Sequence, residues 1–275
     1  MKNISIQRVS NYGTSHPVVA RLPIQSLELV QWADLPKDKR EAVISIYDGL
    51  KNRLLKCHEC YDRLKAASKE TLEAGHVDST GSQIRPYLIG LENEAETFLY
   101  ESKNYFRDLL GVINVFFRIG FHEARNFYTT SGKGDVKLSK WAGHRFGPAD
   151  SFTGMLRNEE DWIGELIRKR NAVEHPGEKS GALIIKNFQL TPDGLVVSPS
   201  WHRDNLPPTD LLADIEAAMD NMLTLAEDLL VTCITKTAKF SIIEFTAIPE
   251  KDRNPNCPIR IRVQLRAPVP AASTT

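Results

Sequence analysis

Residues 166–177 of the chain read LIRKRNAVEHPG, a stretch that begins as a helix and stops at a proline. Apolar residues lie three and four positions apart over residues 155–167, which predicts one buried face of an α-helix. This helix should begin near Asp150, whose side chain can cap its first turn. Arg170 follows Ile163 by seven positions, so it lies on the buried face, where a charge needs a partner.

The end of this helix should bring a histidine towards the arginine. Pro176 disfavours helical backbone at His175, so the helix should end at about Glu174. His175 then leaves the helical register and can fold back towards Arg170. An arginine that holds a phosphate and a histidine that moves a proton are the minimum for cutting RNA without a metal ion. The structural alternatives are an Arg170 that caps the helix or pairs with a carboxylate on a neighbouring helix, and a His175 hydrogen-bonded within a loop.

Other helices are predicted on both sides of this stretch. From residue 37, apolar side chains recur at alternating gaps of four and three until the turn-forming residues 75–82. A second stripe runs from Leu88 to Phe116 and widens towards its end. A further amphipathic helix starts at the proline pair 207–208 and keeps one apolar face as far as Cys233. Two long antiparallel helices joined by a short loop are the start of a helical bundle.

Strand patterns surround this helical framework. Apolar runs on both sides of the turn sequence TPDG, residues 191–194, predict a small hairpin at about 182–198. The predicted fold is therefore mainly α, a bundle of about four helices with small β additions. It divides the chain into an N-terminal arm with short strands (1–36), a helical domain that includes the hairpin (37–238), a C-terminal β segment packed on the bundle (239–267) and a frayed tail (268–275).

The composition is that of an ordinary globular protein. Lysine plus arginine and aspartate plus glutamate number 35 each, which excludes a uniformly basic nucleic-acid-coating protein but leaves room for a local basic patch. No apolar run approaches the roughly 18 residues of a membrane span. The start lacks the apolar core of a signal peptide, and four cysteines in a chain of this length are not a disulfide framework. We therefore predict a cytoplasmic protein with no membrane partner.

The sequence RNAVEH at 170–175 resembles the Arg-x(4–6)-His signature of the HEPN superfamily, including the polar residue directly after the arginine. HEPN domains are bundles of about four helices with the motif at the end of a late helix, which matches the predicted architecture. The resemblance covers residues 38–235 as architecture and about a dozen residues as specific motif. The terminal β segments and the hairpin are additions to the family pattern.

The resemblance implies a metal-independent endoribonuclease that cleaves RNA by attack of the ribose 2′-hydroxyl, in defence, toxin or stress physiology. In that reaction His175 moves the proton, Arg170 holds the phosphate, and Asn171 orients the histidine or binds a phosphate oxygen. Glu174 can set the tautomer of the histidine. The resemblance implies no metal and no cofactor. It also implies a homodimer with two motifs facing one cleft, and a protein antitoxin or regulator as a further partner. The alternatives are a non-catalytic HEPN-like module that binds RNA or a protein, and a helical scaffold without a nucleic-acid role.

Residues 129–148 predict a long loop that is rich in glycine and in basic side chains. Such lysines can follow an RNA backbone as phosphate contacts. The alternative is a solvated loop to which the glycines give flexibility. The candidate RNA-binding residues, with one beside the motif, are Lys133, Lys137, Lys140, Arg145 and Lys169.

Two further motifs give weaker signals. Cys57 and Cys60 have the C-x-x-C spacing of zinc and redox sites. They lie in a predicted long helix without a second pair, and Cys57 falls on the apolar stripe, so a core position is the simpler interpretation. The sequence Trp-His-Arg at 201–203 is expected in a loop after the hairpin, from which it could reach a ligand.

Overall fold

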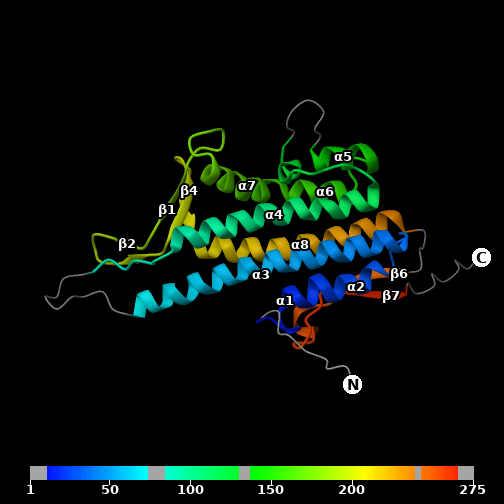
Figure 1. The fold of residues 1–275 in the computed structure, drawn as a ribbon, viewed down its shortest axis with the longest axis horizontal. Helices are drawn as coiled ribbons and strands as arrows, with labels where there is room; N and C mark the ends of the chain where they lie inside the picture. Colours follow the sequence, from blue (N-terminus) through cyan, green and yellow to red (C-terminus); the bar gives the residue numbers. More distant parts are fainter. Residues whose placement is uncertain (1–10, 74–83, 130–136, 239–242, 266–275) are drawn as a thin grey trace, which may run out of the picture.

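The computed structural model describes residues 11–73, 84–129, 137–238 and 243–265. Its framework is a set of long helices that lie side by side (Figure 1). Helix α3 (Lys37–Glu73) and helix α4 (Leu91–Phe117) run in opposite directions, and α8 (Leu211–Thr237) packs against both. Helix α7 (Glu160–Glu174) packs on α4. The prediction of a mainly helical fold with small sheets is confirmed.

The periodicity of the sequence accounts for the packing of the long helices. Every predicted stripe position on α3, from Val43 to Leu64, is buried. On α4 the buried arc widens to include Leu99 and Phe106, because α3, α7 and α8 each cover part of that helix. Each fully buried aliphatic or aromatic side chain contributes roughly 1.5–3 kcal/mol. The buried hydroxyl groups of Tyr47 and Tyr105 donate to carbonyl oxygens of α8 at 2.6 and 2.9 Å, so the core leaves these polar atoms satisfied.

The prediction of strands in residues 1–36 is wrong for the described part of that segment. Helix α1 (Pro17–Val19), the π-helical turn η1 (Ala20–Ile24) and α2 (Gln25–Val30) form a helical segment beside α3 and α8. Pro17 occupies the first helical position, where a missing N–H costs nothing, and His16 caps the turn by accepting from the backbone of Val18. Pro23 falls within the π-helical turn. The prolines that indicated breaks are therefore accommodated by a helix start and by a widened turn.

The long loop predicted at 129–148 is also partly wrong. Residues 138–146 form helix α5 (Leu138–Phe146), which buries Leu138 and Ala142 one turn apart. A short 3-10 helix, η2 (Ala124–Phe127), precedes it, and residues 130–136 lie outside the described residues. Helix α6 (Ser151–Asn158) begins where the motif helix was predicted to begin, because the carboxylate of Asp150 accepts from the backbone of Phe152 at 2.9 Å. The single helix predicted from there to Glu174 is divided, since α6 ends at Asn158 and α7 begins at Glu160. Glycine content suggested a loop where the apolar spacing supports a helix.

A small antiparallel sheet covers the end of the bundle at which α7 stops and α4 and α8 start (Figure 1). Its strand order is β1 (Leu183–Lys186), β4 (Ser200–Arg203) and β5 (Thr209–Asp210). Strands β2 (Gln189–Leu190) and β3 (Val196–Val197) form the predicted hairpin around the turn at 191–194. Residues 201–203, expected in a loop, instead belong to β4, where the Trp201 side chain is fully buried.

A second hairpin, β6 (Ile243–Ala247) with β7 (Ile261–Leu265), follows α8, and the 3-10 turn η3 (Glu250–Asp252) lies between its strands. The Gln25 side chain accepts from the backbone N–H groups of Arg260 and Ile261, at 2.6 and 2.7 Å, which attaches the hairpin to the helical core. The predicted C-terminal tail lies outside the described residues. Among the described helices, none combines the length and apolar character that crossing a bilayer requires.

Candidate functional site

Helix α7 ends where Pro176 predicts. His175 is the C-terminal capping residue, with extended φ of −134° and ψ of 67°, and its backbone N–H donates to the carbonyl of Asn171 at 2.8 Å. Gly177 then has a φ of +81°, a left-handed conformation that favours glycine, and its N–H donates to the carbonyl of Gly181. The chain turns sharply there, and the side of the last turn of α7 that carries His175 stays accessible to solvent.

Arg170 is mostly buried, with 14% of its side chain exposed. Its guanidinium forms an ion pair with Glu174, one turn later on the same helix, although Nη1 makes no hydrogen bond of regular geometry within the described residues. The guanidinium also lies over the ring of Tyr100 on α4, 5.8 Å from its centroid. Burial lowers the pKa of Arg170. The inward-facing arginine therefore lies beside a carboxylate of its own helix and a ring of α4, while its Nη1 atom has no hydrogen-bond partner among the described residues.

His175 is more accessible, with 53% of its side chain exposed. Its Nε2 atom lies 3.5 Å from Oε2 of Glu174, the same oxygen that the Arg170 guanidinium contacts. The two motif residues thus meet at one carboxylate oxygen. Arg170 faces a cavity of about 410 Å³ next to α4, and His175 faces a neighbouring cavity of about 290 Å³. Glu174 lines both cavities and forms the wall between them.

Lys103 on α4 completes the charged group at this helix end. Its Nζ atom donates to Oδ1 of Asn171 at 2.9 Å and lies 3.8 Å from Oε2 of Glu174. Burial and the positive charge of Arg170 lower the pKa of Lys103. Asn171 therefore holds a lysine in this structure. Lys103 was not predicted, because no motif surrounds it and its partner Asn171 lies on a distant part of the chain.

Lys169, predicted as an RNA contact, is buried. Its Nζ atom lies 3.2 Å from Oδ2 of Asp214 and 4.3 Å from the ring centroid of Trp201. An RNA contact at Lys169 stays a prediction, and in this structure Trp201 of β4 and Asp214 of α8 cover its side chain. Lys137 forms an ion pair with Glu160, and Lys133 lies outside the described residues.

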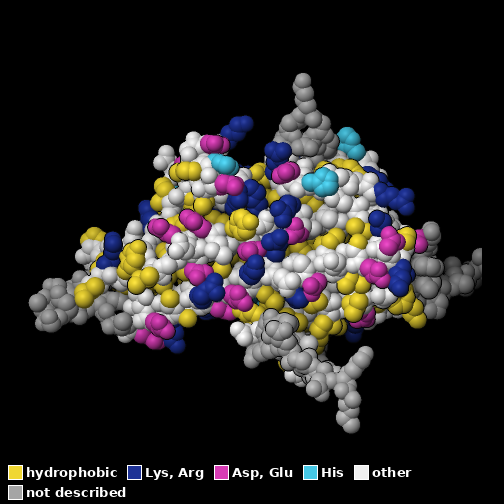
Figure 2. All heavy atoms as spheres, in the orientation of Figure 1, with side chains coloured by type: hydrophobic (Ala, Val, Ile, Leu, Met, Phe, Trp, Pro, Cys, Tyr) yellow, Lys and Arg dark blue, Asp and Glu magenta, His cyan; other side chains and the backbone are white. Residues whose placement is uncertain are grey.

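The remaining predicted RNA contacts lie on α5, which packs over α6 at the opposite end of the molecule from the C-terminus of α7 (Figure 1). Lys140 is exposed, and the guanidinium of Arg145 covers an aromatic cluster, 5.1 Å from the ring centroid of Phe117. Neither joins the motif. The cavity of His175 is lined instead by Lys103, Arg125 and Lys179 together with three glutamates. Figure 2 shows basic and acidic side chains interspersed on the face drawn, without one continuous basic surface.

The C-x-x-C pair lies in the core of the bundle. Cys57 and Cys60 are both buried on α3, and Sγ of Cys57 lies 3.9 Å from the hydroxyl of Ser102. Burial raises the pKa of both thiols, that of Cys60 to about 12. Within the ranges that the structure describes, no group of His, Cys, Asp and Glu side chains is arranged to hold a metal ion. The interpretation of Cys57 as a core residue is confirmed.

Comparison of the chain with models of known families, with curated proteins and with solved structures finds no significant match. The geometry of the described residues points to the end of α7 as the candidate site for chemistry, because a half-exposed histidine, an arginine and a lysine surround one carboxylate there.

Proposed function

We propose that this protein is a HEPN-like, metal-independent endoribonuclease and that the end of α7 is its active site. The observation that carries the proposal is the contact of Arg170 and His175 with a single oxygen of Glu174. A carboxylate that draws a guanidinium and an imidazole together occupies the kind of position that a phosphate oxygen can take over. Lys103, held by Asn171 at the same place, adds an ammonium group.

In the proposed reaction the ribose 2′-hydroxyl attacks the neighbouring phosphorus and the bond from phosphorus to the 5′-oxygen breaks. The products are a 2′,3′-cyclic phosphate and a free 5′-hydroxyl. One proton leaves the 2′-oxygen and one is delivered to the 5′-oxygen, and an exposed imidazole such as that of His175 can perform either transfer. The Arg170 guanidinium exchanges Glu174 for the phosphate and stabilises the negative charge that grows on it.

The proposal includes a homodimer. The reaction needs both a base and an acid, and among the described residues that line the motif cavities His175 is the one histidine. Two copies placed motif to motif would supply two histidines to one phosphodiester. The two open sides of the helix end, facing neighbouring cavities, are compatible with such an arrangement.

The test is cleavage of a fluorescent single-stranded RNA in the presence of EDTA. We expect cleavage with cyclic phosphate ends, which falls by about 100-fold or more in His175→Ala and Arg170→Ala. Lys39→Ala, an exposed change on α3, is the control and should keep the activity of the unmodified protein. An RNA with a 2′-deoxyribose at the cleaved position should stay intact. Absence of cleavage of any RNA tested would remove the proposal.

One observation favours a second candidate function, a non-catalytic HEPN-like module that binds RNA or a protein. Glu174 and Tyr100 already engage the Arg170 guanidinium, so part of its donor capacity is used within the chain. In that case RNA binds without being cut, and His175→Ala leaves the affinity unchanged. Lys103→Ala weakens such binding and makes it less dependent on salt, because a phosphate contact is lost.

A further inference from the structure

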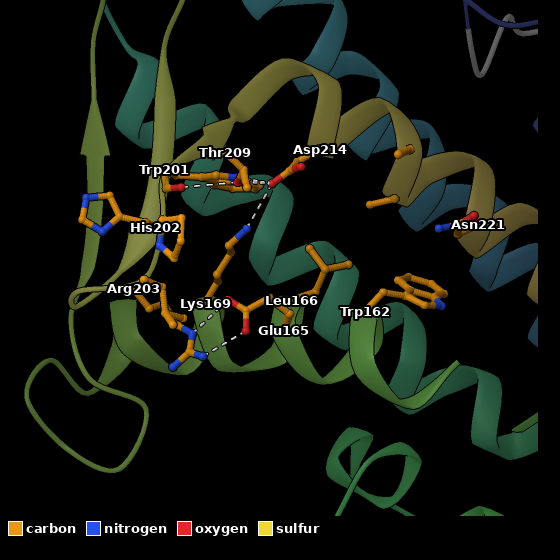
Figure 3. Close-up of a pocket in the computed structure, with 14 residues that line it drawn as sticks. Trp162, Glu165, Leu166, Lys169, Trp201, His202, Arg203, Thr209, Asp214 and Asn221 are labelled. Carbon is orange, nitrogen blue, oxygen red and sulfur yellow. Dashed lines mark hydrogen bonds and ion pairs between the residues drawn. The ribbon is translucent and has the colours of Figure 1, made fainter. Parts of the chain in front are cut away.

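A cavity of about 490 Å³ lies between α7, α8 and the sheet β1-β4-β5 (Figure 3). In that view the indole of Trp162 lies at one end and Trp201 at the other, with Leu166 and Lys169 between them. Apolar residues of the loop before β5 and of α8 complete its walls. These are Leu206, Pro207, Ala217 and Ala218. The volume and the apolar lining are those of a site for a small organic ring system.

The charged groups of this cavity are already paired with one another. Lys169 lies 3.2 Å from Asp214, and Arg203 makes hydrogen bonds of 2.9 and 3.1 Å to the two oxygens of Glu165. Asp214 also accepts from the Trp201 indole at 2.7 Å. A charged ligand would have to break one of these pairs, and the remaining buried charge would be costly. An uncharged, planar ligand fits without that cost.

One hydrogen bond links the lining of this cavity to the lining of the His175 cavity. Arg203 lines it and donates through Nη1 to the carbonyl of Ser180, 2.9 Å away, and Ser180 lines the cavity of His175. A second series of contacts leads from one cavity to the other. Nε of Arg168 lies 3.5 Å from Oε2 of Glu165, which lines the apolar cavity. The Arg168 guanidinium lies 5.2 Å from the ring centroid of Tyr128, which lines the cavity of His175. Side chains that line the apolar cavity are therefore connected to residues that line the candidate active site.

We propose that this cavity binds one unpaired base of the RNA strand whose phosphate lies at the motif, an inference that rests on the function proposed above. A nucleobase is planar, uncharged and aromatic, and single-stranded RNA can turn a base out of its stack onto a tryptophan face. In this cavity that face is offered by Trp162, because Trp201 is fully buried and Lys169 lies over its ring. A base held in a duplex cannot enter. The substrate class is therefore unpaired RNA, in loops or single strands.

The first test uses adenosine, which carries a base but no phosphate, so its binding requires neither the motif nor cleavage. Adenosine should change the tryptophan fluorescence saturably. Ala217→Leu fills the cavity from an exposed position on α8 and should weaken this binding by about tenfold. Ala213→Leu makes the same change one turn earlier, outside the cavity lining, and should bind as the unmodified chain does. Ribose 5-phosphate, which lacks a base, should not bind to the cavity.

The second test compares cleavage of a single strand with that of a duplex of the same sequence. The single strand should be cut, the duplex should not, and Ala217→Leu should slow single-strand cleavage by about tenfold. His175→Ala should abolish cleavage and leave adenosine binding intact. Equal adenosine binding by Ala217→Leu, or none by any variant, overturns the base site even when RNA is cut. If the chain binds adenosine, Ala217→Leu removes that binding and no RNA is cut, the proposed ribonuclease and the link of this cavity to its substrate are overturned. A nucleobase site then remains.

Discussion

At the residue scale, Glu174 controls the electrostatics of the motif. It contacts Arg170, His175 and, at 3.8 Å, Lys103, so three cationic or titratable groups share one carboxylate. Glu174 is 43% exposed, and ion pairs of this exposure contribute about 0–1 kcal/mol to folding. A phosphate can displace a carboxylate that is held this weakly. Glu174 is thus a competitor of the substrate within the proposed mechanism.

The first residue-scale prediction concerns this competition. Glu174→Gln keeps the size of the side chain and removes its charge, so RNA should bind about two- to fivefold more tightly. Affinity is measured in a His175→Ala background, in which the RNA is not consumed. Glu28→Gln, an exposed change on α2, is the matched control and should leave affinity unchanged. Weaker binding in Glu174→Gln would show instead that the carboxylate positions a group on the substrate side.

His58 supports a prediction about pH. Its ring meets that of His16 edge to face, with centroids 4.8 Å apart, and it lies near Asp62. Burial, followed by the charge of His16, lowers the pKa of His58 from 6.5 to about 4, while Asp62 acts in the opposite direction. The unfolded chain takes up the proton below pH 6.5 and the folded chain does not. The contribution of His58 to stability should therefore be constant above pH 6.5 and decrease by at most about 3 kcal/mol towards pH 4.

Urea midpoints recorded between pH 4 and pH 7.5 measure this decrease. His58→Gln should have a shallower dependence over that range, because its side chain takes up no proton. His144→Gln, at an exposed position on α5, should keep the full dependence. Identical slopes for the two variants would mean that the ring contact of His58 with His16 does not couple to folding.

Helical periodicity predicts which side chains share one face of a helix. It does not predict which neighbouring element covers that face. It correctly placed Arg170 towards the interior and predicted the release of His175 at Pro176. It did not reveal that Glu174 would bridge them. It also did not indicate that Lys169 is buried. Trp201, which covers Lys169, belongs to strand β4, and that part of the chain has no clear strand pattern. The candidate site was predictable as a motif and not as a set of contacts.

At the scale of elements, one buried carboxylate joins three parts of the chain. Glu227 on α8 is 1% exposed and accepts from Arg21 of η1 at 3.0 Å, from Gln25 of α2 at 2.7 Å and from Arg260, just before β7, at 2.7 Å. The N-terminal helical segment, the bundle and the C-terminal hairpin therefore all form hydrogen bonds to the carboxylate of Glu227 or carry it. Side-chain spacing along the sequence cannot indicate such a contact, because its members lie far apart in the chain.

Removing this charge should destabilise all three elements. Glu227→Gln leaves two arginines beside a neutral amide in a buried place, which should cost about 3 kcal/mol or more of unfolding free energy. Urea denaturation measures the loss. Asp220→Asn removes a carboxylate from an exposed position of the same helix and should change stability by about 0.5 kcal/mol or less. A Glu227→Gln loss as small as that of the control would mean that the network is dispensable.

The elements predicted best are those whose apolar period is long. The stripes of α3, α4 and α8 extend over many turns, so local irregularities do not obscure them. The segments predicted wrongly are short and contain proline or glycine, as in α1, η1 and α5. Their helical state is set by apolar contacts with the bundle, such as those of Val18 and Leu138, which outweigh the local preference of the backbone.

At the scale of the whole molecule, the proposed homodimer is argued from the distribution of functional groups. Each chain presents one histidine at the described lining of the motif cavities, whereas the proposed reaction transfers two protons. The charges on the face shown in Figure 2 are mixed in sign, so long-range attraction alone does not concentrate RNA at the motif of a single copy. Pairing of two motifs would supply both proton-transfer groups and double the local number of arginines.

The corresponding prediction uses mixtures of active and inactive chains. His175→Ala is added in equal amount to a fixed quantity of unmodified protein, with time for the subunits to exchange. If each cleft needs both histidines, random pairing leaves about half of the unmodified chains in fully active dimers, so the rate should fall to about half. If each chain acts alone, the rate should not change. Sedimentation at the same concentrations establishes that dimers are present, and a dimer whose rate is unaffected by the added variant would show that each subunit carries a complete site.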